Sequence, residues 1–353
     1  MKPQRKLLTS LIDKLDISTE EYLEAVNIAE DIAIHLNRNE KLKGHEPQLF
    51  IQGSFKMGTV TKPTAKDHRY DIDLVCELSA DTKHTISKDD LKALVGEALK
   101  THKIYGSSFM PKPRCWTINI NGKFKLDIVP AIPDLENSKG AILIQDRSEH
   151  NWQPTNPKGY YQWFNEKRKK YFLTVKNNTL DSVNLENLEE HQKTPMQKAI
   201  QILKRLRDIQ FENDPKLKPS SIIITTIVAQ HYNGERNVYE VLDNVVSQLT
   251  KYKNAENISI EEGEENFAEK LNDKVFRSAF ISWIQNVQDM WIKFRNVQNL
   301  DDLKEFSNLG FGHEISDTIF NENDFDLPKK FSVADAPQIR ISTQDAPKPW
   351  RNY

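Results

Sequence analysis

The chain has 353 residues, of which 38% are hydrophobic and 28% are charged, and its formal net charge is −2. Such a composition is typical of a folded globular protein with room for two domains, and it excludes an intrinsically disordered chain. The near-neutral charge argues against a large nucleic-acid surface, so we expect no constitutive nucleic-acid partner. A local basic surface remains open, because lysines and arginines cluster between residues 193 and 218.

Other features of the chain lead us to expect a cytoplasmic protein. No run approaches the roughly 20 apolar residues that span a bilayer, so no membrane partner is expected. The N-terminal segment MKPQRKLLTSLIDKL lacks the apolar core and the small-residue cleavage site of a signal peptide. The two cysteines, Cys76 and Cys115, lie in apolar runs without a CxxC partner and are expected to be reduced.

The first half of the chain alternates between helical and strand-like patterns. Ser18 and Glu21 form a capping box at the start of a helix that the apolar spacing extends to Asn37. The elements predicted next are a strand over Leu49–Gln52, a turn at Gly53-Ser54, a strand over Tyr70–Leu78 and a helix over Ser87–Lys100.

A β-hairpin is predicted to follow. Arg114–Ile120 and Phe124–Val129 have strand patterns, and they are joined by Asn121-Gly122, a dipeptide whose residues both tolerate positive φ. On the second strand, Asp127 is a lone carboxylate on a mostly apolar segment.

The second half of the chain is mainly helical in pattern. Helices are predicted over Tyr160–Lys170, over Met196–Phe211 and within Asn266–Asn296. The run Ile222–Ala229 suits either a strand or a buried helix, and its periodicity leaves the choice open. We expect the acidic stretch Glu261–Glu265 to be a solvated loop.

The most informative residues are Asp71 and Asp73, which stand two apart on one predicted strand. Their side chains therefore project from the same face, and like charges side by side repel unless a cation lies between them. With Asp127 as a third ligand, the acids suit two divalent ions, which clamp the attacking and leaving oxygens in nucleotidyl transfer. Oxygen-only ligands favour magnesium, with manganese as a substitute, over zinc.

Residues suited to a triphosphate accompany the acids. Gly53 lets the backbone approach phosphate oxygens closely, and Ser54 offers a hydroxyl and an amide at the start of a predicted helix. Lys204, on the helix predicted over Met196–Phe211, can reach the same triphosphate as a point charge.

Plainer alternatives stand beside these interpretations. The Gly-Ser pair can be an ordinary turn, and the two acids on the strand can be a surface feature. Asp127 can be a salt-bridge partner of Lys125 or Arg114, and Lys204 with Arg207 can be a solvated helix face. The sequence contains no GxxxxGK[ST], GxGxxG or HExxH motif, which argues against the usual kinase, ATPase, dinucleotide-binding and zinc-protease functions.

The order of the motifs resembles a known signature. Gly53-Ser54, then Asp71-Ile72-Asp73, then Leu126-Asp127 is similar to the signature of polymerase-β-like nucleotidyltransferases. A finer resemblance is to the bacterial cGAS/DncV-like nucleotidyltransferases (CD-NTases), over about Gln52 to Asn272. It is carried by the segments QGSFKMGTVTKP, YDIDLVCEL, KLDIVPAIP, TNPKGYYQWF, AIQILKRLRDI, KPSSIIITTIVA and ENFAEKLND.

The resemblance implies an α+β fold. A polymerase-β-like core, with a mixed twisted sheet and helices, would precede a C-terminal helical domain of the oligoadenylate-synthetase type. We therefore expect the core with its N-terminal helix at residues 1–160, the helical nucleotide-binding domain at 161–330 and a tail at 331–353. The resemblance also favours a buried helix at Ile222–Ala229.

The resemblance assigns roles to the site residues as well. Asp71, Asp73 and Asp127 would be catalytic and would ligate two Mg²⁺ ions. The nucleotide-binding residues would be Gln52, Gly53, Ser54, Lys204, Ser220 and Ser221.

The implied function is the synthesis of a cyclic di- or trinucleotide second messenger from NTPs, ATP among them, in bacterial anti-phage (CBASS) signalling. Regulatory or effector proteins of a defence system are candidate partners. An RNA- or tRNA-tailing nucleotidyltransferase and a non-catalytic nucleotide-binding sensor remain open as alternatives.

Overall fold

The computed structural model describes residues 2–64, 69–137, 140–145, 151–176, 193–254, 261–262 and 265–322. Its contacts divide the chain into two compact units, one of Ile17–Asn165 and one of Met1–Asp16 with Glu166–Tyr353. None of the described helices combines the length and the apolar character that crossing a membrane requires. The predicted tail at residues 331–353 lies outside the described residues.

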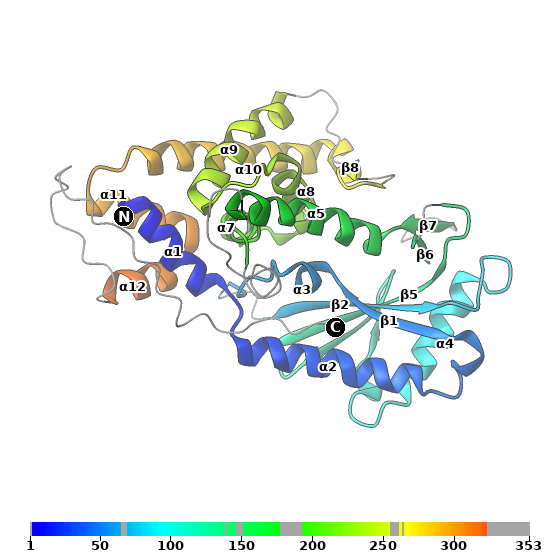
Figure 1. The fold of residues 1–353 in the computed structure, drawn as a ribbon. Helices are drawn as coiled ribbons and strands as arrows, with labels where there is room; N and C mark the ends of the chain where they lie inside the picture. Colours follow the sequence, from blue (N-terminus) through cyan, green and yellow to red (C-terminus); the bar gives the residue numbers. More distant parts are fainter. Residues whose placement is uncertain are drawn as a thin grey trace. The chain divides into compact units, whose positions relative to one another are not determined.

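The Ile17–Asn165 unit is built on a mixed seven-stranded sheet (Figure 1). The strand order is β1-β2-β5-β4-β3, and β6 pairs with β5 and with β7. β2 and β5 run parallel, whereas the other paired strands of this sheet are antiparallel. The strands are β1 (Pro47–Gln52), β2 (Tyr70–Leu78), β3 (Met110–Pro111), β4 (Trp116–Ile120), β5 (Phe124–Pro133), β6 (Ile142–Gln145) and β7 (Trp152–Thr155).

The main core of this unit lies between the sheet and the helices α2 (Thr19–Asn37) and α4 (Lys88–Lys100), and Figure 1 shows α2 running along the sheet. The predicted capping box at Ser18 is confirmed, with Glu21 as its partner. Alternate residues of β2 enter the core, among them Ile72 and Leu74. Because strand side chains alternate, Asp71 and Asp73 face away from this core.

The short elements of the unit are α3 (Gly53–Met57), η1 (Lys43–His45) and η2 (Gly106–Ser108). The predicted hairpin is confirmed between β4 and β5. Asn121 and Gly122 both have positive φ, at 53° and 67°, as its turn requires.

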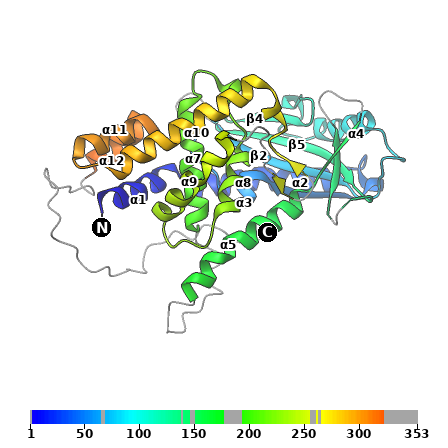
Figure 2. The ribbon, with the colours of Figure 1, turned by 90° about the horizontal axis from the view of Figure 1, so that it is seen from above.

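The second unit is helical apart from one short hairpin in its described residues. Its helices are α1 (Pro3–Leu15), α7 (Pro195–Gln210), η3 (Pro215–Leu217), α8 (Ser221–His231), α9 (Val238–Asn254), η4 (Glu269–Asn272), α10 (Lys274–Arg295), α11 (Leu300–Phe311) and α12 (His313–Asn321). Figure 2 shows α10 running along α7 and α9. α5 (Pro157–Lys176) contains the boundary between the two units.

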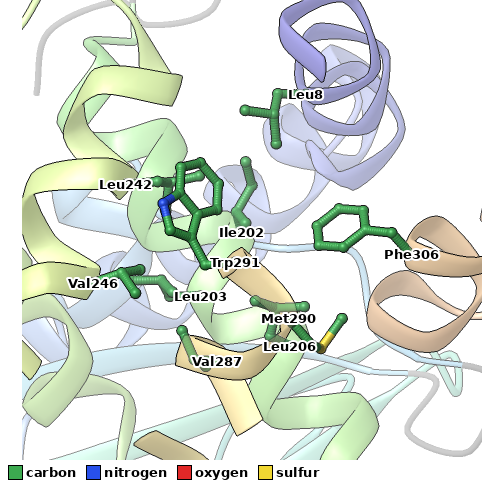
Figure 3. A pocket seen from close by; sticks show the side chains of 10 residues that line it. All are labelled: Leu8, Ile202, Leu203, Leu206, Leu242, Val246, Val287, Met290, Trp291 and Phe306. Carbon is green, nitrogen blue, oxygen red and sulfur yellow. The ribbon is translucent and has the colours of Figure 1, made fainter. Parts of the chain in front are cut away.

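A small apolar cavity of about 10 Å³ lies inside this helical unit. Its lining side chains come from five helices and point toward one another, as Leu8 of α1, Leu203 of α7 and Trp291 of α10 do in Figure 3. A volume near that of one water-sized sphere, with apolar walls, marks a small packing gap and not a ligand site.

The contact units differ in their bounds from the domains expected from the sequence. Their boundary falls at Asn165–Glu166, and α1, which lies within the residues 1–160 expected to form the core, packs on α7, α9 and α12. The physical reason is the apolar face of α1, whose Leu7, Leu8 and Leu11 are buried. In the acidic stretch, Glu261–Glu262 and Glu265–Asn266 pair as two short strands, β8 and β9, where we predicted a loop.

Two further expectations concern helices. Ile222–Ala229 lies within the helix α8, which settles the choice that periodicity left open. The supposedly solvated face of α7 is buried, since Lys204 is 6% exposed and Arg207 is 3% exposed.

Candidate active site

The strand register brings two of the predicted acids side by side. In the parallel pairing of β2 with β5, Asp73 lies opposite Asp127 and Asp71 lies opposite Lys125. The side chain of Asp71 is 62% exposed, whereas that of Asp127 is only 20% exposed. The result is a row of carboxylates on the face of the sheet that α2 and α4 do not cover.

Gln52 and Gly53 border Asp73 on the other side. Gln52 is the antiparallel partner of Asp73 and the N-cap of α3. Gly53 has φ +67°, and a Cβ placed on it would lie 2.3 Å from Asp73 Oδ2. Only glycine tolerates both the left-handed backbone and this close approach. The next residue, Ser54, stands in the first turn of α3, half-buried.

A lysine joins the other two acids. Lys125 Nζ lies 3.1 Å from Asp71 Oδ1 and 2.9 Å from Asp127 Oδ2. Burial lowers the pKa of Lys125, but the charges of Asp71 and Asp127 outweigh burial and raise that pKa overall. The salt bridge between Lys125 and Asp127, one of the plainer alternatives for this acid, is therefore present.

Thr117 is a partner of the site that no sequence motif pointed to. Thr117 is the cross-strand neighbour of Asp127 on β4, it is buried, and its Oγ1 donates a hydrogen bond of 2.5 Å to Asp127 Oδ1. The hairpin register gave the signal, because pairing Ile120 with Phe124 places residue 117 opposite residue 127. Cys115, two residues before Thr117, has its Sγ 3.6 Å from the Thr117 hydroxyl. Burial and then the charge of Asp127 raise the pKa of the Cys115 thiol.

Whether these residues suit a divalent metal follows from their chemistry. Among the described residues, no three His, Cys, Asp or Glu side chains already converge on one point. The donors are nonetheless carboxylate oxygens, which magnesium prefers, and two of the three acids already hold a cation, the Lys125 ammonium. The chemistry of these donors therefore fits magnesium.

The remaining predicted residues lie in the helical unit, so the acids and these residues belong to different units. Arg207 of α7 donates to Ser221 Oγ at 2.9 Å and to the carbonyl of Pro219 at 3.0 Å. Ser220 is exposed at the N-cap of α8, and its side chain makes no capping hydrogen bond. Lys204 is buried on α7, one turn before Arg207.

Asp208 forms ion pairs with two basic side chains of this region. It pairs with Arg207 at 2.6 Å and with Lys218 at 3.3 Å. Burial raises the pKa of Asp208, but Arg207, Lys218 and Lys204 outweigh burial and lower it overall. Arg207, for which a solvated helix face was one alternative, thus connects the start of α8 to α7.

Comparison with known proteins places the chain. The model of the Second Messenger Oligonucleotide or Dinucleotide Synthetase domain matches residues 1–168. A c-di-GMP synthase of Roseivirga ehrenbergii is 31% identical over 275 residues, which are 73% of this chain and 70% of the relative.

Two solved structures share the fold. The CD-NTase CdnG of Bradyrhizobium diazoefficiens, in complex with GTP, has a TM-score of 0.72 and 16% identity over 91% of this chain and 100% of its own. Vibrio cholerae DncV, a cyclic AMP-GMP synthase bound to the linear intermediate 5′ pppA(3′,5′)pG, has a TM-score of 0.66 and 14% identity over 89% and 96%. With these folds and a relative above 30% identity, the chain belongs to the cGAS/DncV-like nucleotidyltransferases, the CD-NTases, which synthesise cyclic oligonucleotides on a polymerase-β-like fold.

Proposed function

We propose that this chain joins nucleoside triphosphates into a cyclic dinucleotide second messenger. The 31% identical relative is a c-di-GMP synthase, and the two solved neighbours were captured with GTP and with a linear dinucleotide. GTP is therefore the substrate that we favour. The sequence-based expectation of ATP stays a prediction, to be tested against GTP in the same experiment.

The reaction consists of two nucleotidyl transfers. In each, a ribose hydroxyl loses its proton and its oxygen forms a bond to an α-phosphorus, while the bond from that phosphorus to pyrophosphate breaks. The second transfer closes the ring. The energetic problem is negative charge, because it develops on the attacking oxygen and on the departing pyrophosphate.

The carboxylate row is suited to this problem. Asp71, Asp73 and Asp127 would hold two divalent cations, magnesium or manganese, which supply charge stabilisation at the attacking and leaving oxygens. The observation that carries the proposal is the position of Asp73. It lies between Gln52 and Asp127 on neighbouring strands, and a Cβ on Gly53 would come within 2.3 Å of its Oδ2. The Gly-Ser turn and the acids, 17 residues or more apart in sequence, thus lie next to one another, which supports a shared site.

Nucleotide-binding roles are part of the proposal in both units. We assign triphosphate contacts to Gln52, Gly53 and Ser54 in one unit and to Lys204, Ser220 and Ser221 in the helical unit. The Ser221 hydroxyl accepts a hydrogen bond from Arg207, which fixes its position at the start of α8. Its remaining hydrogen-bonding capacity suits a phosphate oxygen. In this proposal residues 17–165 are the catalytic core.

Mass spectrometry of products made from all four NTPs with magnesium tests the proposal. We expect a cyclic dinucleotide that resists phosphatase, together with pyrophosphate. The Asp73→Asn variant should make none, whereas Asp301→Asn, a change at an exposed aspartate of α11, should match the wild type. Elongated RNA as the only product, or nucleotide binding without pyrophosphate release, would contradict the proposal.

The biological setting is part of the proposal. A second-messenger synthase of this family would act in anti-phage (CBASS) signalling, with regulatory or effector proteins as partners. Plating phage on bacteria that carry the gene and its neighbours tests this setting. Protection that survives Asp71→Asn combined with Asp73→Asn would contradict it.

A further inference from the structure

A cation built into the chain already lies among the proposed metal ligands. Lys125 projects from β5 opposite Asp71, and its ammonium spans from Asp71 Oδ1 at 3.1 Å to Asp127 Oδ2 at 2.9 Å. These two oxygens belong to different strands. Lys125 therefore neutralises the like-charge repulsion that two neighbouring carboxylates would otherwise suffer.

The oxygens of Asp127 are both engaged. Oδ2 contacts Lys125, and Oδ1 accepts the hydrogen bond of the Thr117 hydroxyl. A hydroxyl is neutral and can share an oxygen with a metal ion. An ammonium cannot do so at low cost, because its charge repels the ion and its protons occupy the same lone pairs.

We propose that Lys125 is an internal counter-ion of the acidic row, which consists of Asp71, Asp73 and Asp127, and that its ammonium competes with divalent cations for Asp71 Oδ1 and Asp127 Oδ2. Lys125 thereby weakens divalent binding in the absence of nucleotide. Two divalent ions and Lys125 together carry more positive charge than three aspartates balance. A nucleotide triphosphate brings the missing negative charge, so it favours loading of the ions and offers the displaced ammonium a new partner. This inference rests on the proposed metal site.

The chain provides a matched control for Lys125. Lys123 lies two residues earlier, and its side chain is 34% exposed, against 31% for Lys125. Lys123 also contacts two acids, Glu24 at 2.8 Å and Glu21 at 3.8 Å, and neither belongs to the acidic row. Removing either lysine changes the net charge equally, so a difference between the two variants reports position and not overall charge.

The experiment measures manganese binding by calorimetry, with Mn²⁺ alone and then with a non-hydrolysable GTP analogue. For Lys125→Met we expect about tenfold tighter binding of Mn²⁺ alone than for the wild type. Lys123→Met and the charge-conserving Lys125→Arg should stay within about twofold of the wild type. With the analogue present, the gap between Lys125→Met and the wild type should shrink.

A second readout uses no metal. In excess EDTA, the unfolding midpoint of Lys125→Met should fall below that of Lys123→Met, because the acids then repel without a counter-ion. Circular dichroism confirms the fold, and Lys125→Gln replaces the methionine variant if that variant does not fold.

Equal or weaker Mn²⁺ binding by Lys125→Met would overturn the inference, as would equal gains in Lys125→Met and Lys123→Met. NTP turnover measured in parallel separates the two proposals. Wild-type turnover with unchanged manganese affinities refutes the counter-ion role alone. Tighter binding by Lys125→Met with no turnover in any protein refutes the proposed reaction alone.

Discussion

Gly53 lies directly against Asp73, since a Cβ on Gly53 would come within 2.3 Å of Asp73 Oδ2, and the glycine has φ +67°. The Gly53-Ser54 turn therefore lies against Asp73, the residue opposite Asp127 in the parallel pairing of β2 with β5. The contact links a backbone requirement to the position of a proposed metal ligand. The backbone strain of a glycine-to-alanine substitution can be told apart from the clash with Asp73, because Gly122 shares the positive φ but has no such neighbour.

Gly53→Ala should abolish most of the activity, whereas Gly122→Ala should preserve it. Gly122 also has φ +67°, yet a Cβ there would meet nothing within 4 Å. Both variants bear the backbone strain of a left-handed residue, which costs about 1 kcal/mol. Only Gly53→Ala must also push Asp73 aside. Unfolding curves and initial rates of pyrophosphate release check this, and similar activity losses in both variants would contradict it.

Thr117→Val should lower kcat about tenfold with little change in KM, because Asp127 loses the hydroxyl that orients it. The unfolding free energy should fall by about 1 kcal/mol for the lost hydrogen bond. Thr117→Ser keeps the donor and should restore kcat. Steady-state kinetics of the three proteins give the test, and a valine variant with wild-type kcat would show that Thr117 does not position Asp127.

Arg207 and Lys204 should differ in what their removal costs. Arg207→Met removes the ion pair with Asp208, which keeps the one with Lys218, and takes a donor from the carbonyl of Pro219, so stability should fall by about 2 kcal/mol. Lys204→Met should raise KM for the NTP about tenfold, if Lys204 binds phosphate as proposed. Denaturant unfolding and substrate titration distinguish the two effects. A lysine variant with unchanged KM would remove Lys204 from the site.

Stability should fall on acidification, in part through His102. Burial, and then the nearby His35, lowers the pKa of His102 below its usual 6.5. Its Nδ1 accepts hydrogen bonds from the backbone amides of Ile104 and Tyr105, which a protonated ring cannot do.

The sign of the effect follows from these contacts. The unfolded chain takes up the proton at a higher pH than the folded chain, so the contribution of His102 is complete above pH 6.5. It is lost as pH falls through the lower folded pKa. Unfolding free energies of the wild type and His102→Asn between pH 7.5 and about 5 check this, and parallel pH profiles would contradict it.

Local patterns were enough to predict much of this protein. The bounds of β2, the capping box at Ser18 and the hairpin turn at Asn121-Gly122 depend on neighbours in sequence. So does the placement of Asp71 and Asp73 on one face, because a strand has a period of two. The family resemblance then followed from the order of short motifs, without any knowledge of their contacts.

Tertiary structure decided the relations between distant segments. The pairing of Asp73 with Asp127 depends on a parallel register between strands some 50 residues apart, which no local period specifies. The same register places Lys125 between Asp71 and Asp127. The salt bridge of Asp127 with Lys125, which was an alternative to a metal site, is therefore found among the proposed metal ligands. Burial of Arg207 depended on the packing of α8 against α7, and the hydrophobic pattern of α7 alone could not reveal it. Sequence therefore determined which groups the chain carries and which way each strand presents them, whereas tertiary structure determined which of those groups meet.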